Sequence, residues 1–258
     1  MDSRLLITCE HGGADVPAKY ARLFRGQRRL LDSHRGYDAG ALEMARRFAD
    51  QLAAPLIFST TTRLLVDLNR SAHHRHVFSE FTSPLDREQR AALLAEHHAP
   101  YRQDVQKRIA GMTTVGVVVI HLSVHTFTPI LNGARRTADV GLLYDSRRRP
   151  EAEFCGHWGG VLRRRRPDLR VRRNYPYLGK ADGLTTALRK QYGEDRYLGV
   201  ELEVCRAWWK PGNAAWRRLQ HDLIEAFRET THAAPGFAST ATASTPTNAK
   251  RRIVDPTQ

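Results

Sequence analysis

The stretch VGVVVIHLSVHTF spans residues 115–127 and decides the fold. Its first eight residues are apolar at nearly every position and rich in β-branched side chains, which favour strands. A strand without a polar face is usually covered on both sides, as in a sheet that lies between two layers of helices. We therefore predict a central strand at 115–122 within an α/β sheet.

Further strands and helices are expected to alternate along the chain on both sides of this stretch. The expected strands are 5–9, 55–59, 63–67, 140–144 and 197–204, with an irregular or edge-strand segment at 171–179. The expected helices are 37–53, 86–110 with an interruption at Pro100, 151–166 and 212–231. Such alternation favours a mainly parallel sheet with helices on both faces.

The domain organisation follows from a change in composition near residue 234. Beyond this point the sequence is rich in Ala, Ser, Thr and Pro and has no apolar period. Segments of this kind bury too little apolar surface to fold. We expect one catalytic domain at 1–237 and a disordered tail at 238–258.

The formal net charge of +14 attracts anions, including nucleic acid. The arginines are spread along the whole chain, however, and the densest run, Arg163–Arg166, is typical of a solvated helix end and loop. We therefore do not expect a nucleic-acid partner, although a basic anion- or nucleic-acid-binding protein with a degenerate site stays an alternative. A small anionic substrate fits the same charge.

The sequence also bears on location. No apolar run reaches about 18 residues, the length of a membrane span, and the N-terminal segment lacks the pattern of a signal peptide. The cysteines Cys9, Cys155 and Cys205 form no CxxC pair, so we expect reduced thiols. We expect a cytoplasmic monomer or small homo-oligomer without a membrane partner.

Polar residues with metal-binding side chains gather where the predicted strands end. His11 follows the first strand, His125 follows the central strand, and the segment Asp67–Arg70 follows the strand expected at 63–67. Open α/β sheets place their sites at the carboxyl ends of strands. Two histidines, a carboxylate and an open position make a catalytic zinc site.

Two positions near these histidines have more than one candidate. Asp38, at the start of the first long helix, is the expected carboxylate ligand, and His34 is its rival. Glu201 and Glu203 lie two residues apart in a strand and therefore share a face. We expect Glu203 to act as the general base on a metal-bound water, with Glu201 as the alternative.

Six segments, in this order, resemble the N-formylglutamate amidohydrolase family. They are CEHGGADVP (9–17), SHRGYDAGA (33–41), RLLVDLNRS (63–71), HLSVHTF (121–127), LLYD (142–145) and GVELEVCR (199–206). The resemblance covers about residues 5–210. It implies a three-layer α/β/α domain of the phosphorylase/hydrolase-like type with a mostly parallel mixed sheet. It also implies one Zn²⁺ ion and hydrolysis of the amide bond of an N-acylated amino acid such as N-formylglutamate.

The resemblance assigns zinc-binding and catalytic roles residue by residue. His11, Asp38 and His125 match the zinc ligands, and Glu203 matches the catalytic glutamate. Arg70 belongs to the matching DLNR segment, and we expect it to take part in catalysis or to hold the α-carboxylate of the substrate; a structural ion pair with Asp67 is the alternative.

The resemblance also assigns the substrate-binding residues. Asn69 and Arg70 of the DLNR segment match substrate-binding positions, and Arg135 lies in a loop where a substrate-binding arginine is expected, with Arg136 as its rival. The expected substrate is a small anionic N-acyl amino acid. Hydrolysis of a peptide or cell-wall amide is the alternative within the hydrolases.

Overall fold

A computed structural model describes residues 2–233 and 251–252 of the chain. In this part of the chain seven strands form one sheet in the order β7-β6-β8-β3-β1-β2-β9. Their bounds are β1 Asp2–Cys9, β2 Leu56–Phe58, β3 Val117–Phe127, β6 Val140–Leu143, β7 Val171–Arg173, β8 Tyr197–Cys205 and β9 Arg251–Arg252. All neighbours pair in parallel except β6 and β8, which are antiparallel. The predicted mostly parallel mixed sheet is confirmed.

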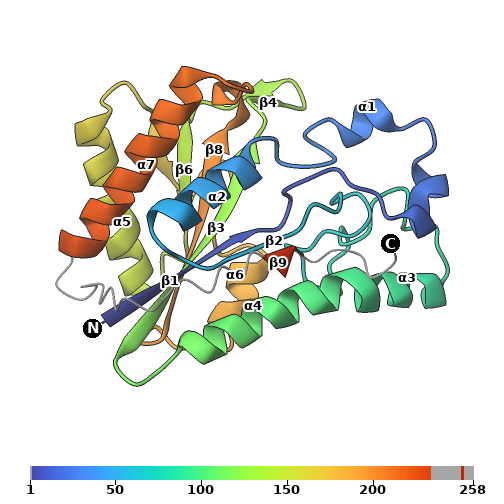
Figure 1. The fold of residues 1–258 in the computed structure, drawn as a ribbon, viewed down its shortest axis with the longest axis horizontal. Coiled ribbons are helices and arrows are strands. Elements are labelled where there is room, and N and C mark those ends of the chain that lie inside the picture. The colour runs from blue at the N-terminus through green and yellow to red at the C-terminus, as the bar shows by residue number, and fades with distance from the viewer. Residues whose placement is uncertain (1, 234–250, 253–258) are drawn as a thin grey trace.

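Helices cover both faces of the sheet (Figure 1). One layer contains α2 (Ala41–Gln51), α5 (Arg149–Arg165) and α7 (Ala214–Ala233), and the other contains α4 (Ala99–Met112) and α6 (Leu184–Arg189). The remaining elements lie in the connections: η1 Ala18–Phe24, α1 Arg28–Leu31, α3 Arg87–Leu93, η2 Leu94–His98, β4 Ile130–Leu131, β5 Ala134–Arg135 and η3 Arg206–Trp208. None of the helices described is both long and apolar enough to cross a membrane.

The two faces of β3 differ in chemistry, and this difference positions the site. Residues 118–127 are all buried. Alternate side chains from Val118 to Val124 join the apolar cluster beneath α2, α5 and α7. The intervening residues His121, Ser123 and His125 lie on the opposite face and are buried as well. Because buried polar groups are normally hydrogen-bonded, this second face requires a network of polar partners.

The strand predicted at 63–67 is wrong, because these residues form a buried loop without strand pairing. The loop satisfies its backbone groups locally. The Asp67 N–H donates to the Val77 carbonyl at 2.9 Å, and the Ser79 hydroxyl donates to the Leu64 carbonyl. The apolar residues 64–66 pack inward from a loop just as they would from a strand, so the sequence pattern alone did not distinguish the two.

The other predicted elements agree with the structure to within a few residues. The helix expected at 86–110 consists of α3, the π-helical turn η2 and α4, with Pro100 in the first turn of α4, where its missing N–H is tolerated. Of the tail predicted at 238–258, only Arg251 and Arg252 are described, and they pair with β2. The rest of that prediction, and the domain boundary at 237, lie outside the described residues.

The buried His121 generates a prediction about acid stability. Its Nε2 lies 2.9 Å from the Thr8 hydroxyl and its Nδ1 lies 2.7 Å from the Tyr197 hydroxyl. Burial lowers the pKa of His121 from 6.5 to about 4. The unfolded chain therefore binds a proton that the folded chain excludes, and stability should fall as the pH decreases from about 6.5 to about 4, by up to about 3 kcal/mol.

Urea unfolding at several pH values between about 7 and about 4.5 tests this prediction. His121→Gln keeps a polar side chain that does not titrate, and its free energy of unfolding should depend less steeply on pH than that of the wild type. Equal pH slopes for the two proteins would contradict the assignment.

Candidate metal centre

The centre lies at the carboxyl ends of β1 and β3. His11 follows β1, and its carbonyl accepts the backbone N–H of Asp38 at 2.9 Å, which holds the loop before α2 against the end of β1. The next residue, Gly12, donates its N–H to the Ser59 carbonyl at 3.0 Å. A Cβ at Gly12 would lie 2.8 Å from that carbonyl oxygen, so glycine permits this close approach.

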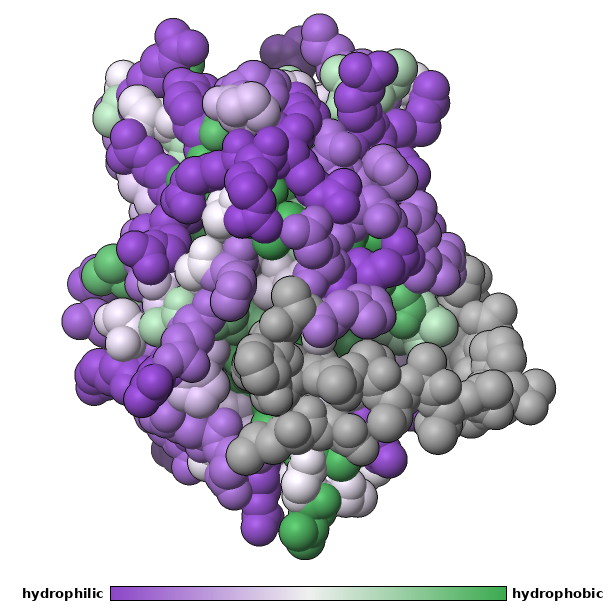
Figure 2. All heavy atoms as spheres, turned by 90° about the vertical axis from the view of Figure 1, so that its left-hand side faces the viewer, coloured by the Kyte–Doolittle hydropathy of each residue, from purple (hydrophilic) through white to green (hydrophobic). Residues whose placement is uncertain are grey.

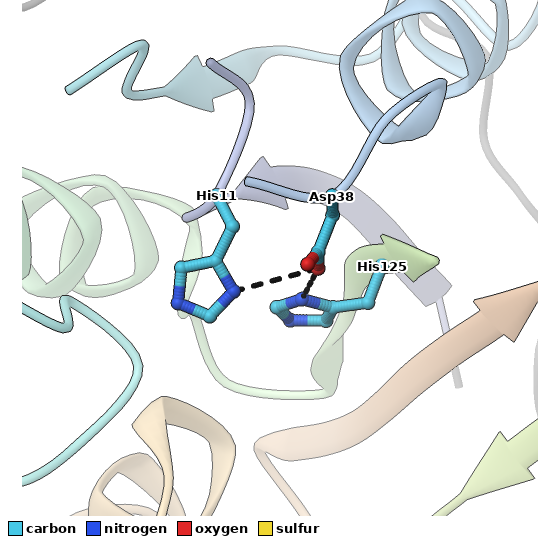
Figure 3. A group of neighbouring side chains, drawn as sticks. All are labelled: His11, Asp38 and His125. Carbon is cyan, nitrogen blue, oxygen red and sulfur yellow. Dashed lines mark hydrogen bonds and ion pairs between the residues drawn. The ribbon is translucent and has the colours of Figure 1, made fainter. Parts of the chain in front are cut away.

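Three predicted ligands meet at this point (Figure 3). His11, Asp38 and His125 each offer one ligand atom, and these atoms lie within 4.8 Å of one another. The exposed fractions of the three residues are 2%, 6% and 3%. Asp38 Oδ2 lies 2.9 Å from His125 Nδ1 and 3.4 Å from His11 Nδ1. Two imidazoles and a carboxylate are the donor set of a catalytic zinc site.

The outer nitrogens of both rings, the Nε2 atoms that point away from Asp38, contact other buried groups. His11 Nε2 lies 2.8 Å from Asp67 Oδ1. His125 Nε2 lies 3.1 Å from Glu10 Oε2 and 2.9 Å from the Ser123 hydroxyl. A ring that donates its Nε2–H to a carboxylate keeps the lone pair on Nδ1, and carboxylate partners of this kind orient histidine ligands in metal sites.

Glu10 is held in turn. Its Oε1 accepts the Tyr101 hydroxyl at 2.9 Å and its Oε2 accepts the Ser123 hydroxyl at 2.7 Å. Burial raises the pKa of Glu10, but the hydrogen bonds and charge of His125, with the Ser123 hydroxyl, lower it well below its usual range. Glu10 is therefore a charged group that supports His125.

The inner atoms, which are the two Nδ1 atoms and the Asp38 carboxylate oxygens, form a set that suits a cation. Burial lowers the pKa of His125, but hydrogen bonds to Asp38 and Glu10 raise it well above its usual value. Burial raises the pKa of Asp38, but the two imidazoles lower it below its usual range. His11 Nδ1 is buried and makes no hydrogen bond. Without a metal the set therefore retains protons, and a bound cation would replace them, as ligand deprotonation on metal binding requires.

Glu203 lies beside the centre. It is paired in register with His125 on the neighbouring strand and is 6% exposed. Its Oε2 is buried without a hydrogen-bond partner. Burial raises its pKa to about 8; His125 opposes this shift, and Asp38 adds to it. A carboxyl group whose pKa is shifted toward neutrality by burial is suited to proton transfer.

Glu201 has a different environment on the same face of β8. Its register partner is Ser123, so it lies further from the strand end than Glu203. Its Oε1 accepts the Thr185 hydroxyl at 2.6 Å, and the residue is partly exposed. The geometry therefore favours Glu203 over Glu201 as the group that faces the metal set.

Arg63 is a site residue that sequence reasoning missed. Its Nη2 lies 2.7 Å from Asp67 Oδ2 and its Nη1 lies 3.6 Å from Asp38 Oδ1. The guanidinium therefore bridges the two carboxylates that contact the ring nitrogens of His11. An arginine four residues before Asp67 was a visible signal, but the segment was predicted as a strand. A cation in this position can stabilise negative charge that develops on a substrate oxygen.

The remaining predicted residues do not contact the metal set directly in the contacts described. Asn69 Oδ1 accepts the Leu184 N–H at 2.8 Å, and Arg70 Nη1 donates to the Asp182 carbonyl at 2.9 Å, so both hold the segment before α6. Arg135 is exposed on β5. His34 is exposed and does not join the metal set.

Three of the four arginines of the basic run Arg163–Arg166 at the end of α5 are paired with acidic side chains. Arg164 and Arg165 each lie 3.1 Å from a carboxylate oxygen of Glu229. Arg166 pairs with Asp168 at 2.7 Å and Asp222 at 2.8 Å. The face shown in Figure 2 is largely hydrophilic. These ion pairs agree with a solvated helix end rather than with a binding strip for a polyanion.

Comparisons with known proteins give one family. The N-formylglutamate amidohydrolase family matches residues 3–209. No curated protein sequence matches the chain.

Solved structures share the fold. The gene product Atu2144 from Agrobacterium tumefaciens is 26% identical, with a TM-score of 0.76 over 88% of this chain and 89% of that one. N-formylglutamate amidohydrolase from Ralstonia eutropha JMP134 is 18% identical, with a TM-score of 0.61 over 88% of this chain and 93% of that one.

The carboxylate behind His11 gives a test of the metal centre that leaves every ligand in place. Asp67→Asn should weaken zinc binding about 10- to 100-fold, because a neutral amide that accepts the same hydrogen bond polarises the His11 ring less than a carboxylate does. Competition with a chromogenic chelator measures this affinity. Asp222→Asn, which removes a surface ion-pair partner of Arg166, should leave it unchanged. Equal zinc affinities for the two variants would contradict the proposed role of Asp67.

Proposed function

The chain belongs to the N-formylglutamate amidohydrolase family, whose members are amide hydrolases, and we propose that it cleaves an N-formyl or N-acyl amino acid with a zinc ion held by His11, Asp38 and His125. The observation that carries this proposal is the position of one Asp38 oxygen between two histidine Nδ1 atoms. The Nε2 atoms of the same rings are held by carboxylates. His11 Nδ1, which is buried and makes no hydrogen bond, supports the fit of a cation.

The donor set matches the chemistry of the metal. Imidazole nitrogen suits zinc and several other divalent ions, and a carboxylate completes a three-residue catalytic site. A zinc ion bound there would lower the pKa of water toward about 7 and act as a Lewis acid toward the substrate carbonyl.

Glu203 carries the proton transfers in this proposal. Its carboxylate takes a proton from the attacking water and then passes it to the amine nitrogen as the C–N bond breaks. Burial, which raises the pKa of Glu203, would help its carboxyl group to hold the proton between these two steps. The products are a short acid, such as formate, and a free amino acid.

Cationic and polar side chains bind the substrate. The Arg63 guanidinium, which is 29% exposed and anchored on Asp67, is placed to stabilise the oxyanion of the tetrahedral state. Asn69 and Arg70 are proposed as substrate contacts from the family resemblance, with Arg70 also available to the oxyanion. Arg136, which directly follows the β4–β5 hairpin, is a further arginine available for a substrate carboxylate.

The general base gives the test of this proposal. Glu203→Gln should lower kcat/KM for N-formyl-L-glutamate roughly 100- to 10,000-fold, because the amide cannot accept the water proton. Zinc content, measured on the same sample, should stay at the wild-type level.

Glu201→Gln is the matched control for this experiment. The same isosteric change on the same strand face should alter kcat/KM less than tenfold, about 1.4 kcal/mol. Full activity in Glu203→Gln, or a larger loss in Glu201→Gln, would overturn the assignment of the base.

A further inference from the structure

Arg136 lies beside the end of β3 that carries the metal ligand. Phe127 follows His125 by two residues on β3, so both side chains project from the same face. The guanidinium carbon of Arg136 lies 5.7 Å from the centre of the Phe127 ring and 4.8 Å from that of Tyr177. Its Nη2 also donates to the Tyr177 hydroxyl at 2.8 Å. Two aromatic side chains therefore hold this cation at the end of β3 that carries His125.

Tyr177 and Arg136 also act electrostatically on residues around the centre. Burial lowers the pKa of Arg63, whereas Asp67 and Asp38 raise it, and Tyr177 adds to that increase. Burial also lowers the pKa of His34, with contributions from Arg206, Arg136 and Arg63. Interactions of this kind weaken with distance, so Tyr177 and Arg136 belong to the surroundings of the centre.

The charge of Arg136 is not neutralised by the described part of the chain. Apart from the Tyr177 hydroxyl, its recorded hydrogen-bond acceptor is the Thr128 carbonyl, at a long 3.5 Å. Arg63, by contrast, is paired with Asp67. A partly buried guanidinium that is held by aromatic rings and lacks an acidic partner retains donors for a carboxylate, which arginine binds through two parallel hydrogen bonds.

Arg135 provides an internal comparison. It precedes Arg136 directly, but it is exposed on β5, and no aromatic contact or ion pair is recorded for it within residues 2–233. The two arginines therefore differ in their relation to the site, although they are neighbours in the sequence.

We propose that Arg136, held by Phe127 and Tyr177, binds a free carboxylate of the substrate and makes the enzyme select an N-acyl amino acid over its amide. This inference rests on the proposed function and adds a specificity-determining residue to it. Tyr177 is a positioning residue, since its hydroxyl accepts a hydrogen bond from the guanidinium and its ring packs against it.

Selectivity between acid and amide substrates tests the assignment. The substrates are N-formyl-L-glutamate and its two mono-amides, N-formyl-L-glutamine and N-formyl-L-isoglutamine. The wild type should prefer the diacid over one mono-amide by about 10- to 100-fold in kcat/KM. Arg136→Gln should lose most of this preference, Arg136→Lys should retain part of it, and Arg135→Gln should keep it. Tyr177→Phe should raise KM a few-fold with little change in kcat.

A binding measurement separates this inference from the proposed function. Calorimetry measures the affinity of N-formyl-L-glutamate for the zinc-loaded wild type, Arg136→Gln and Arg135→Gln. If the wild type cleaves no N-acyl amino acid but Arg136→Gln alone weakens binding tenfold or more, the proposed activity fails and the carboxylate site stands. The inference is overturned if N-formyl-L-glutamate does not bind, if the wild type does not discriminate between acid and amides, or if Arg136→Gln behaves like Arg135→Gln.

Discussion

The interaction on which the centre depends is the approach of two buried imidazole rings to one oxygen of Asp38. Burying charged or polar groups is costly unless they are paired, and every ring nitrogen here except His11 Nδ1, which lies 3.4 Å from Asp38 Oδ2, is within hydrogen-bond distance of a partner. The outer nitrogens contact Asp67 and Glu10, and the inner ones face Asp38. Arg63 then balances the negative charge of Asp67 and Asp38. These contacts hold the three ligands so that one donor atom of each lies within 4.8 Å of the others, where a single metal ion can bind.

The sheet makes this arrangement possible because its two faces perform different tasks. One face of β1, β3 and β8 packs into the largest apolar cluster, beneath α2, α5 and α7. The opposite face carries the polar side chains Glu10, Ser123 and His125 of one network. Parallel register between β3 and β8 then places Glu203 beside His125. The apolar face stabilises the fold. The polar face can therefore carry buried side chains whose role is to bind a charged group.

The sequence predicted the parts of this centre that depend on local pattern. The apolar run at 115–122 identified the central strand, and His11 and His125 followed from their positions at strand ends. Asp38 and His34 were both candidates for the third ligand from the local sequence. Only the tertiary structure distinguishes them, because Asp38 contacts both histidine rings. Arg63 could not be found in this way, because its role comes from contacts with Asp67 and Asp38 made by a loop that resembles a strand in sequence.

Elemental analysis of the purified protein measures whether His11, Asp38 and His125 together bind one zinc ion. We expect about one zinc per chain, lost in His11→Ala and His125→Ala and retained in His34→Ala, whose side chain lies outside the set. A wild-type protein that holds no metal after zinc is added back and the excess removed would contradict the account. So would His11→Ala and His125→Ala variants that bind as much zinc as the wild type.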